Sequence, residues 1–290
     1  MALTRQSVVV FNEAAHTYTN TKTGLLMTPV SKVKDLVHVP FDGNAVSGFM
    51  AMAEAKQTGN CTDAMVMVIK KRILAEWENT KNIANTRGTH IHKVIESLIP
   101  FLKESDLVLH TKIIAATAGQ NYHEAVTEII FSLRKYYQSC SEYILYSEYY
   151  NVCGTADHIG LRQNTKTSLI DIDDWKTNEF TYDSVKIKPD SIKHYNKFLL
   201  EPLDYLEDCK YIDLALQLSM YGVLAEETYP GFRIGRLTGH NIDHRGVYRK
   251  LPVPYMRREA IALLEHKRGL KKLPTLPVEI NQLVETDDEW

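Results

Sequence analysis

The stretch LIDIDDWKTN (residues 169–178) decides the fold class of this chain. It begins as an apolar run typical of a buried strand and ends with three aspartates and a lysine. The preceding stretch TADHIGLR (residues 155–162) has the same strand-like composition, and the polar segment QNTKT joins the two. We therefore predict an antiparallel hairpin that turns at Thr165 and Lys166.

The predicted hairpin brings two carboxylates together. With this turn, positions whose numbers add to 331 face each other, so Asp157 lies opposite Asp174. Side chains directly opposite each other have Cβ atoms about 5 Å apart, and like charges so close repel unless a cation lies between them. Because hard divalent ions prefer carboxylate oxygens, the hairpin predicts a site for Mg²⁺ or Mn²⁺.

Side chains alternate along a strand, so Lys176 shares a face with Asp174, while Asp171 and Asp173 lie on the other face. A lysine in that place can orient or deprotonate a metal-bound water and counter charge on a phosphoryl oxygen. The alternative is an exposed Asp-Lys pair that contributes less than ~1 kcal/mol. We expect Asp171 and Asp173 to be exposed or to support the site from behind.

The rest of the chain predicts one mixed α/β domain with a helical N-terminal part. The 290 residues, 44% of them hydrophobic, are enough to form a full core. Short strand-like runs open the chain, and no repeat or Gly/Ser linker divides it. We predict helices at residues 45–102, with a break at NTRGT (residues 85–89), and at 122–138, 211–228 and 255–270. Further strands are predicted at 143–152, 233–237 and 247–253.

Composition excludes several classes of protein. A net charge of −2 excludes a uniformly basic nucleic-acid binder, although basic clusters occur at residues 70–72, 186–197, 257–258 and 266–272. The four cysteines form no C-x-x-C pair, so neither a zinc site nor a disulfide framework is predicted. No apolar run approaches the roughly 18 residues that span a bilayer, and the N-terminal run is too short for a signal peptide. We expect a cytoplasmic protein without a membrane partner.

Four motifs resemble one enzyme family. GTADHIG and LIDIDDWKTN are similar to the Asp and (Asp/Glu)-x-Lys motifs of the PD-(D/E)XK nuclease superfamily, in its RecB-like exonuclease branch. RGTHIHKVIE resembles the branch's Gly-Thr-x-x-His-x-x-x-Glu helix motif, and LQLSMYG resembles its Gln-x-x-x-Tyr motif. The motifs follow the family's order over residues 87–221. The DWKT form looks most like phage-encoded exonucleases and the mitochondrial genome maintenance exonuclease.

The resemblance implies a restriction-endonuclease-like core, with a central mixed β-sheet flanked by helices, at residues 81–270. Residues 1–80 would form an N-terminal hairpin and helical part, and residues 271–290 a C-terminal tail. The implied activity is Mg²⁺- or Mn²⁺-dependent DNA exonuclease activity in phage or bacterial recombination, repair or replication, inside the host cell if phage-encoded. A site-specific endonuclease or resolvase, and a catalytically inactive DNA- or protein-binding relative, remain alternatives. The cysteine pattern of iron-sulfur members and a nucleotide-binding loop are both absent.

The resemblance also implies roles for individual residues. The predicted metal ligands are His92, Asp157, Asp174 and the main-chain carbonyl of Trp175. The predicted catalytic residues are Asp157, Asp174, Lys176, Gln217 and Tyr221, of which the last two help to hold the lysine or the DNA. Second-tier candidates are Glu96, which shares a helix face with His92, and Glu148. The predicted DNA contacts are Lys186, Lys188, Lys193 and Lys197. Expected partners are single-stranded DNA or duplex ends, and phage or host recombination or replication proteins. For the acidic tail ETDDEW we expect a frayed, solvated end, and docking of a replication protein is the alternative.

Overall fold

The computed structural model describes Leu3 and residues 8–15, 17–59, 61–163, 168–177 and 197–269. Its strands are β1 (Val9–Asn12), β2 (Thr17–Asn20), β3 (Leu26–Pro29), β4 (Gln138–Ser147), β5 (Val152–Gln163), β6 (Ser168–Lys176), β7 (Arg233–Ile242) and β8 (Tyr248–Val253). Its α-helices are α1 (Val30–Lys34), α2 (Gly43–Gln57), α3 (Asp63–Leu98), α4 (Asp106–Ala116), α5 (His123–Leu133), α6 (Lys210–Thr228) and α7 (Arg257–Arg268), with short 3₁₀ turns at Asp35–Val37 and Ile99–Phe101. Within these ranges, no helix is both long and apolar enough to cross a membrane.

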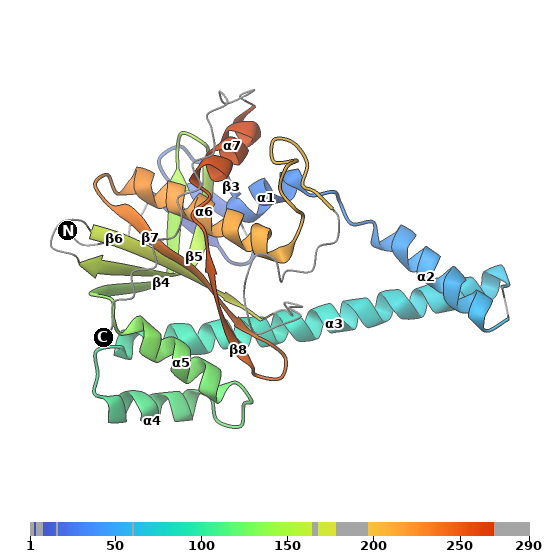
Figure 1. Cartoon of the computed structure of the whole chain (residues 1–290), viewed down its shortest axis with the longest axis horizontal. Coiled ribbons are helices and arrows are strands. Elements are labelled where there is room, and N and C mark those ends of the chain that lie inside the picture. Colours follow the sequence, from blue (N-terminus) through green and yellow to red (C-terminus); the bar gives the residue numbers. More distant parts are fainter. Residues whose placement is uncertain are drawn as a thin grey trace.

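All eight strands belong to one mixed sheet (Figure 1). The strand order is β1-β2-β3-β5-β6-β7-β8, and β4 pairs with β5 beside this path. The β3–β5 and β6–β7 pairs are parallel, and the other pairs are antiparallel. The predicted fold class, a central mixed sheet flanked by helices, is therefore confirmed.

The register of the β5–β6 hairpin is the predicted one. His158 pairs with Asp173, and the ladder continues to Gln163 opposite Ser168. The pair numbers add to 331, and one further step along both strands places Asp157 opposite Asp174. The predicted turn residues lie outside the described part of the chain. Side-chain alternation fixes this register, because a slip by one residue would move the buried isoleucines of β6 to the opposite face.

Helices cover the sheet on both faces, in two separate cores (Figure 1). On one face, α1, α6 and α7 pack over Ile170 and Ile172 of β6. On the other face, the C-terminal part of α3 packs with α4 and α5 around Trp175 of β6 and Ile242 of β7. The alternation of β6 thus sends Asp174 and Lys176 toward α6.

The long helix α3 is continuous for 36 residues, so the predicted break at NTRGT is wrong. Gly88 lies inside the helix, where it costs about 1 kcal/mol relative to alanine. A Cβ at this position would lie 2.9 Å from Thr177 Oγ1, so glycine allows α3 to approach the end of β6 closely. The interruption falls instead between α2 and α3, which form a two-helix arm that projects from the sheet (Figure 1).

Candidate active site

Asp157 of β5 and Asp174 of β6 form the base of the candidate site. The Trp175 backbone N–H donates to Asp157 Oδ2 at 2.7 Å, which ties the two strand ends together. Both carboxylates are largely buried, with side-chain exposures of 14% and 4%. Burial raises the pKa of Asp157 well above its ordinary value, and the neighbouring Asp174 carboxylate raises it further. The pair therefore carries an electrostatic cost that a bound cation would relieve.

Lys176, Asp174 and Gln217 form a closed set of three contacts. Lys176 Nζ lies 2.7 Å from Asp174 Oδ2 and donates to Gln217 Oε1 at 3.3 Å. Gln217 Nε2 donates to Asp174 Oδ1 at 3.0 Å. Burial alone would lower the pKa of the lysine, but the Asp174 and Asp157 carboxylates outweigh it and raise that pKa. The lysine is therefore held as an ammonium ion that can donate hydrogen bonds.

Tyr221 lies one turn beyond Gln217 on α6 and supports it. Its side chain is buried, and a hydrogen bond joins it to Gln217. Burial, with the two site aspartates, raises the pKa of the Tyr221 hydroxyl well above its ordinary value. Its ring packs on Gly154 of β5, where a Cβ would lie 2.7 Å from the ring atom Cε1. This glycine gives the ring room to reach the site.

His92 of α3 faces the same carboxylates from the opposite helical layer. Its Nε2 lies 3.0 Å from the Trp175 carbonyl oxygen, and its Nδ1 lies 3.7 Å from Asp157 Oδ1. Burial lowers the pKa of His92, and Asp174 only partly offsets this effect, so the imidazole is neutral near pH 7. Because a carbonyl oxygen can only accept, Nε2 carries the proton, and the Nδ1 lone pair is left facing Asp157.

Glu142 of β4 joins this cluster, although sequence analysis missed it. One oxygen of Glu142, one of Asp157 and a ring nitrogen of His92 all lie within 4.8 Å of one another. The β4–β5 register explains the position, since the pairs on either side place Glu142 opposite Asp157. Glu142 has a φ of 46°, so the strand is locally distorted at this residue. Residue numbers paired across β4 and β5 add to 299, so a predicted strand that started at Gln138 would have placed Glu142 opposite Asp157.

The two second-tier glutamates lie elsewhere. Glu148 lies just past β4, where its carboxylate pairs with Lys22 at 3.6 Å. It is six residues beyond Glu142, about 20 Å along the chain, so the structure does not bring it to the cluster. Glu96 is exposed on α3 and is not part of the group formed by His92, Glu142 and Asp157.

Asp171 and Asp173 are buried, so of the two predicted alternatives exposure is excluded and support of the site from behind remains. Asp173 accepts hydrogen bonds from His158 Nδ1 at 2.9 Å and from His240 Nε2 at 3.0 Å. Asp171 pairs with Arg162 at 2.9 Å. The Tyr136 hydroxyl donates to both aspartates. Burial by itself would raise the pKa of Asp173, but the two histidine hydrogen bonds lower it, so this carboxylate is ionised.

Of the predicted DNA contacts, Lys197 is exposed next to the loop that leads to α6. The others, Lys186, Lys188 and Lys193, lie outside the described residues, as does the acidic tail.

The donor set fits a hard divalent cation. Glu142 and Asp157 supply carboxylate oxygens and His92 supplies a neutral imidazole nitrogen, all within 4.8 Å of one another. Asp174 adds a neighbouring carboxylate, whose two oxygens also contact Gln217 and Lys176. Carboxylates suit Mg²⁺ and Mn²⁺, and a single imidazole is compatible with Mn²⁺. The Trp175 carbonyl accepts from His92 and keeps a second lone pair. These residues can therefore hold the metal that the sequence predicts.

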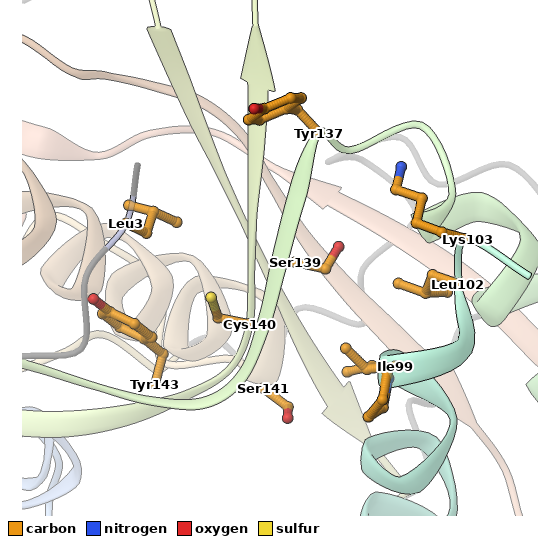
Figure 2. A pocket seen from close by; sticks show the side chains of 10 residues that line it. Leu3, Ile99, Leu102, Lys103, Tyr137, Ser139, Cys140, Ser141 and Tyr143 are labelled. Carbon is orange, nitrogen blue, oxygen red and sulfur yellow. The ribbon is translucent and has the colours of Figure 1, made fainter. Parts of the chain in front are cut away.

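A hollow of about 480 Å³ lies away from this cluster, between the 3₁₀ turn at Ile99–Phe101 and the start of β4. Figure 2 shows Lys103, Ser139 and Cys140 among the side chains around it. None of the clustered carboxylates lines it.

Comparisons with known proteins add little. No protein-family model matches the chain, and no curated protein matches its sequence. Among solved structures, the chain is similar to a protein from Eubacterium rectale that is named as a candidate exonuclease, with 14% identity and a TM-score of 0.35 over 90% of this chain and 93% of that one. The function proposed below therefore rests on the residues and geometry of this chain.

Proposed function

We propose that this chain is a nuclease that hydrolyses DNA phosphodiester bonds with the help of Mg²⁺ or Mn²⁺. One observation carries the proposal: Asp157, Asp174 and Lys176 meet at one end of the β5–β6 hairpin, with Glu142 and His92 completing the cluster. Carboxylates that converge beside a protonated lysine suit a reaction in which negative charge builds on a phosphoryl group.

Each residue has a distinct task in this proposal. Glu142, Asp157, Asp174 and His92 would hold the metal, which when bound lowers the pKa of a water molecule and stabilises charge on the phosphate. The Lys176 ammonium donates a hydrogen bond to a phosphate oxygen or to the attacking water. Its charge also opposes the negative charge that develops during attack.

The α6 residues keep the lysine in place. Gln217 binds both partners of the Asp174–Lys176 ion pair, so neither side chain can rotate away without breaking a hydrogen bond. Tyr221 anchors Gln217 from one turn further along the helix. This arrangement gives the Gln-x-x-x-Tyr motif a physical role, since it positions the charged groups before the substrate arrives.

The finer assignment is an exonuclease that acts on single-stranded DNA or duplex ends, in phage or bacterial recombination, repair or replication. The four motifs in family order support this choice. The proposed location is the cytoplasm of a bacterial host. Endonuclease activity on the same core gives a different product pattern, which the assay below separates.

The test uses end-labelled single-stranded DNA, duplex DNA and RNA of defined length, with Mg²⁺, with Mn²⁺, or with EDTA. We expect metal-dependent cutting of DNA that shortens the strand progressively from an end. Glu142→Gln should slow cutting by about 100-fold, as expected when a charged group at the reaction centre is removed. Glu148→Gln, just past the end of β4 and outside the cluster, should cut as wild type.

Three results would contradict the proposal. They are cutting that persists in EDTA, a Glu142→Gln variant as active as wild type, and no cutting of any nucleic acid by a folded, metal-loaded protein. Internal fragments from the first minutes of reaction would overturn the exonuclease assignment and leave the nuclease assignment intact.

A further inference from the structure

A second pocket lies on the far side of α3 from His92. Its volume is about 620 Å³, within the range of small-molecule sites. Its lining residues come from α3, from the turn between α4 and α5, and from the turn between β7 and β8. His90 precedes His92 by two residues, about 200° around the helix, so the two histidines face different sides. The residues that line it include Ile83, Arg87, His90, Asn121, Tyr122 and His244.

Arg87 gives this pocket a positive charge that the nearby Asp243 carboxylate compensates only in part. Its guanidinium donates to the backbone carbonyls of Thr177, Ile242 and Asp243 and forms no ion pair with a described residue. Burial lowers the pKa of Arg87, and the nearby Asp243 carboxylate offsets this effect only in part. No acidic residue occurs among the described residues that line the pocket. An anion would therefore be stabilised here.

Polar residues make up most of the lining of the pocket, but its exposed surface is contributed mainly by apolar atoms, and one buried polar atom needs a partner. Ile83 is 61% exposed on the wall formed by α3. Tyr122 is 2% exposed, and its hydroxyl is buried with no hydrogen-bond partner among the described residues. Buried hydroxyls normally find a partner. A ligand with a flat apolar body and a hydrogen-bonding edge would satisfy both features.

The pocket is built into the fold. Asn121 Nδ2 donates to the His244 carbonyl at 3.0 Å, which joins the two turns that bound it. Gly246 has a φ of +85°, and a Cβ there would lie 2.0 Å from the Asn121 carbonyl oxygen. Only glycine fits this close contact, so the turns are held against each other without a ligand.

We propose that this pocket binds one nucleotide, with its phosphate beside Arg87 and His90, its base on Ile83 and the edge of the base toward the Tyr122 hydroxyl. A nucleotide joins an anion to a flat ring with a hydrogen-bonding edge. The phosphate complements the Arg87 guanidinium, and the base complements the apolar surface and the Tyr122 hydroxyl. The choice of a nucleotide rests on the proposed function. The connection to the reaction centre is direct, because Arg87 binds the carbonyl of Thr177, the residue after Lys176.

The proposed occupant is a nucleotide of the substrate strand or of the product. A strand that reaches both sites passes α3 from the His92 side to the His90 side. Occupation of the pocket then holds the strand while the neighbouring site cuts it. Weakening the pocket should therefore raise the KM for an oligonucleotide while leaving kcat close to wild type.

The direct test measures binding of deoxythymidine monophosphate by isothermal titration calorimetry in EDTA, so that neither metal nor cleavage takes part. Thymidine and inorganic phosphate serve as the two halves of the ligand. The variants are Ile83→Asp and His90→Asp, both at exposed positions that are not themselves among the groups that anchor Arg87. His266→Asp, at an exposed histidine in the last turn of α7, is the matched control.

We expect wild type to bind the mononucleotide at millimolar concentration or better, and more tightly than either half. Each pocket variant should weaken binding by about tenfold or more, because a carboxylate then faces the phosphate, and the control should bind as wild type. No binding by wild type, or pocket variants that bind equally well, would overturn the inference. If the protein cuts DNA but does not bind the mononucleotide, only the proposed nucleotide site is contradicted. If it binds the mononucleotide but does not cut DNA, only the proposed nuclease activity is contradicted.

Discussion

Replacing the buried Asp173 by asparagine should destabilise the protein substantially. This carboxylate accepts hydrogen bonds from His158 and His240 in the core behind the candidate site. Hydrogen bonds to a buried charged group each contribute about 1.5–3 kcal/mol. Asparagine is close in size and keeps one acceptor, but it loses the charge and turns a second acceptor into a donor. We expect the free energy of unfolding to fall by about 4 kcal/mol.

The magnitude can be converted to a melting temperature. Unfolding entropy is about 2.1 cal/mol/K per residue, or roughly 0.6 kcal/mol/K for 290 residues. A loss of about 4 kcal/mol then lowers Tm by roughly 6–7 °C. Urea unfolding followed by circular dichroism gives the free energy directly, and calorimetry gives Tm. Asp35→Asn, at an exposed carboxylate paired with Lys32, is the control and should change stability by less than about 1 kcal/mol.

The effect of Asp173→Asn should depend on pH in one direction. The folded state lowers the pKa of Asp173, so its stabilising contribution is present above the unfolded pKa of about 3.9 and is lost as pH falls below that value. The difference between wild type and variant should therefore be constant near neutral pH and shrink below about pH 4. A loss below about 1 kcal/mol at pH 7 would refute the assigned role of the two histidines.

Three further predictions concern contacts around the site. Gly154→Ala should lower Tm and slow DNA cutting, because the new Cβ meets the Tyr221 ring at 2.7 Å; unchanged values in both assays would contradict this packing. Gln217→Leu should slow cutting by about 10- to 100-fold, since it removes both contacts that hold the ion pair, while circular dichroism stays unchanged. The hydrogen bond to Asp213 raises the pKa of His38, so its stabilisation is full below about pH 6.5 and is lost as pH rises through the folded value. His38→Gln should therefore cost about 1 kcal/mol in urea unfolding at pH 6 and less at pH 9, and an equal loss at both would refute the charged pairing.

The hairpin at the centre of the sheet was predictable because its determinants are local. The turn composition and the two-residue alternation fix the register, and the register alone places Asp157 opposite Asp174. The spacing from Asp174 to Lys176, and from Gln217 to Tyr221, follows from strand and helix geometry in the same way.

The features that sequence analysis missed depend on contacts between distant segments. Asp173 is buried between His158, which the predicted hairpin register places opposite it, and His240, which comes from β7. Nothing near Asp173 in the sequence indicates the contact with His240. Glu142 joins the cluster through the pairing of β4 with β5 and a locally distorted backbone. Gly88 does not break α3, because the absence of a side chain there lets the helix pack closely against Thr177.

Two elements between residues 106 and 147 show where hydrophobic periodicity fails to predict secondary structure. Helix α4 was not predicted, since Leu109 and Ile113 are its only buried residues and offer too short an apolar pattern. The start of β4 was placed five residues late, because Gln138 and the residues after it are polar and only half-buried. Because the predicted strand spans residues 143–152, it leaves out Glu142 and includes Glu148.

The most direct test of the account is single-turnover cleavage of end-labelled DNA in Mg²⁺ by wild type, Asp174→Asn and Lys176→Met. The account predicts that wild type cuts, that EDTA stops it, and that each variant is slower by about 100-fold or more, because each loses a charge at the reaction centre. Binding of the same DNA in EDTA shows that the variants remain folded and still reach the substrate. Variants that cut as fast as wild type would contradict the account.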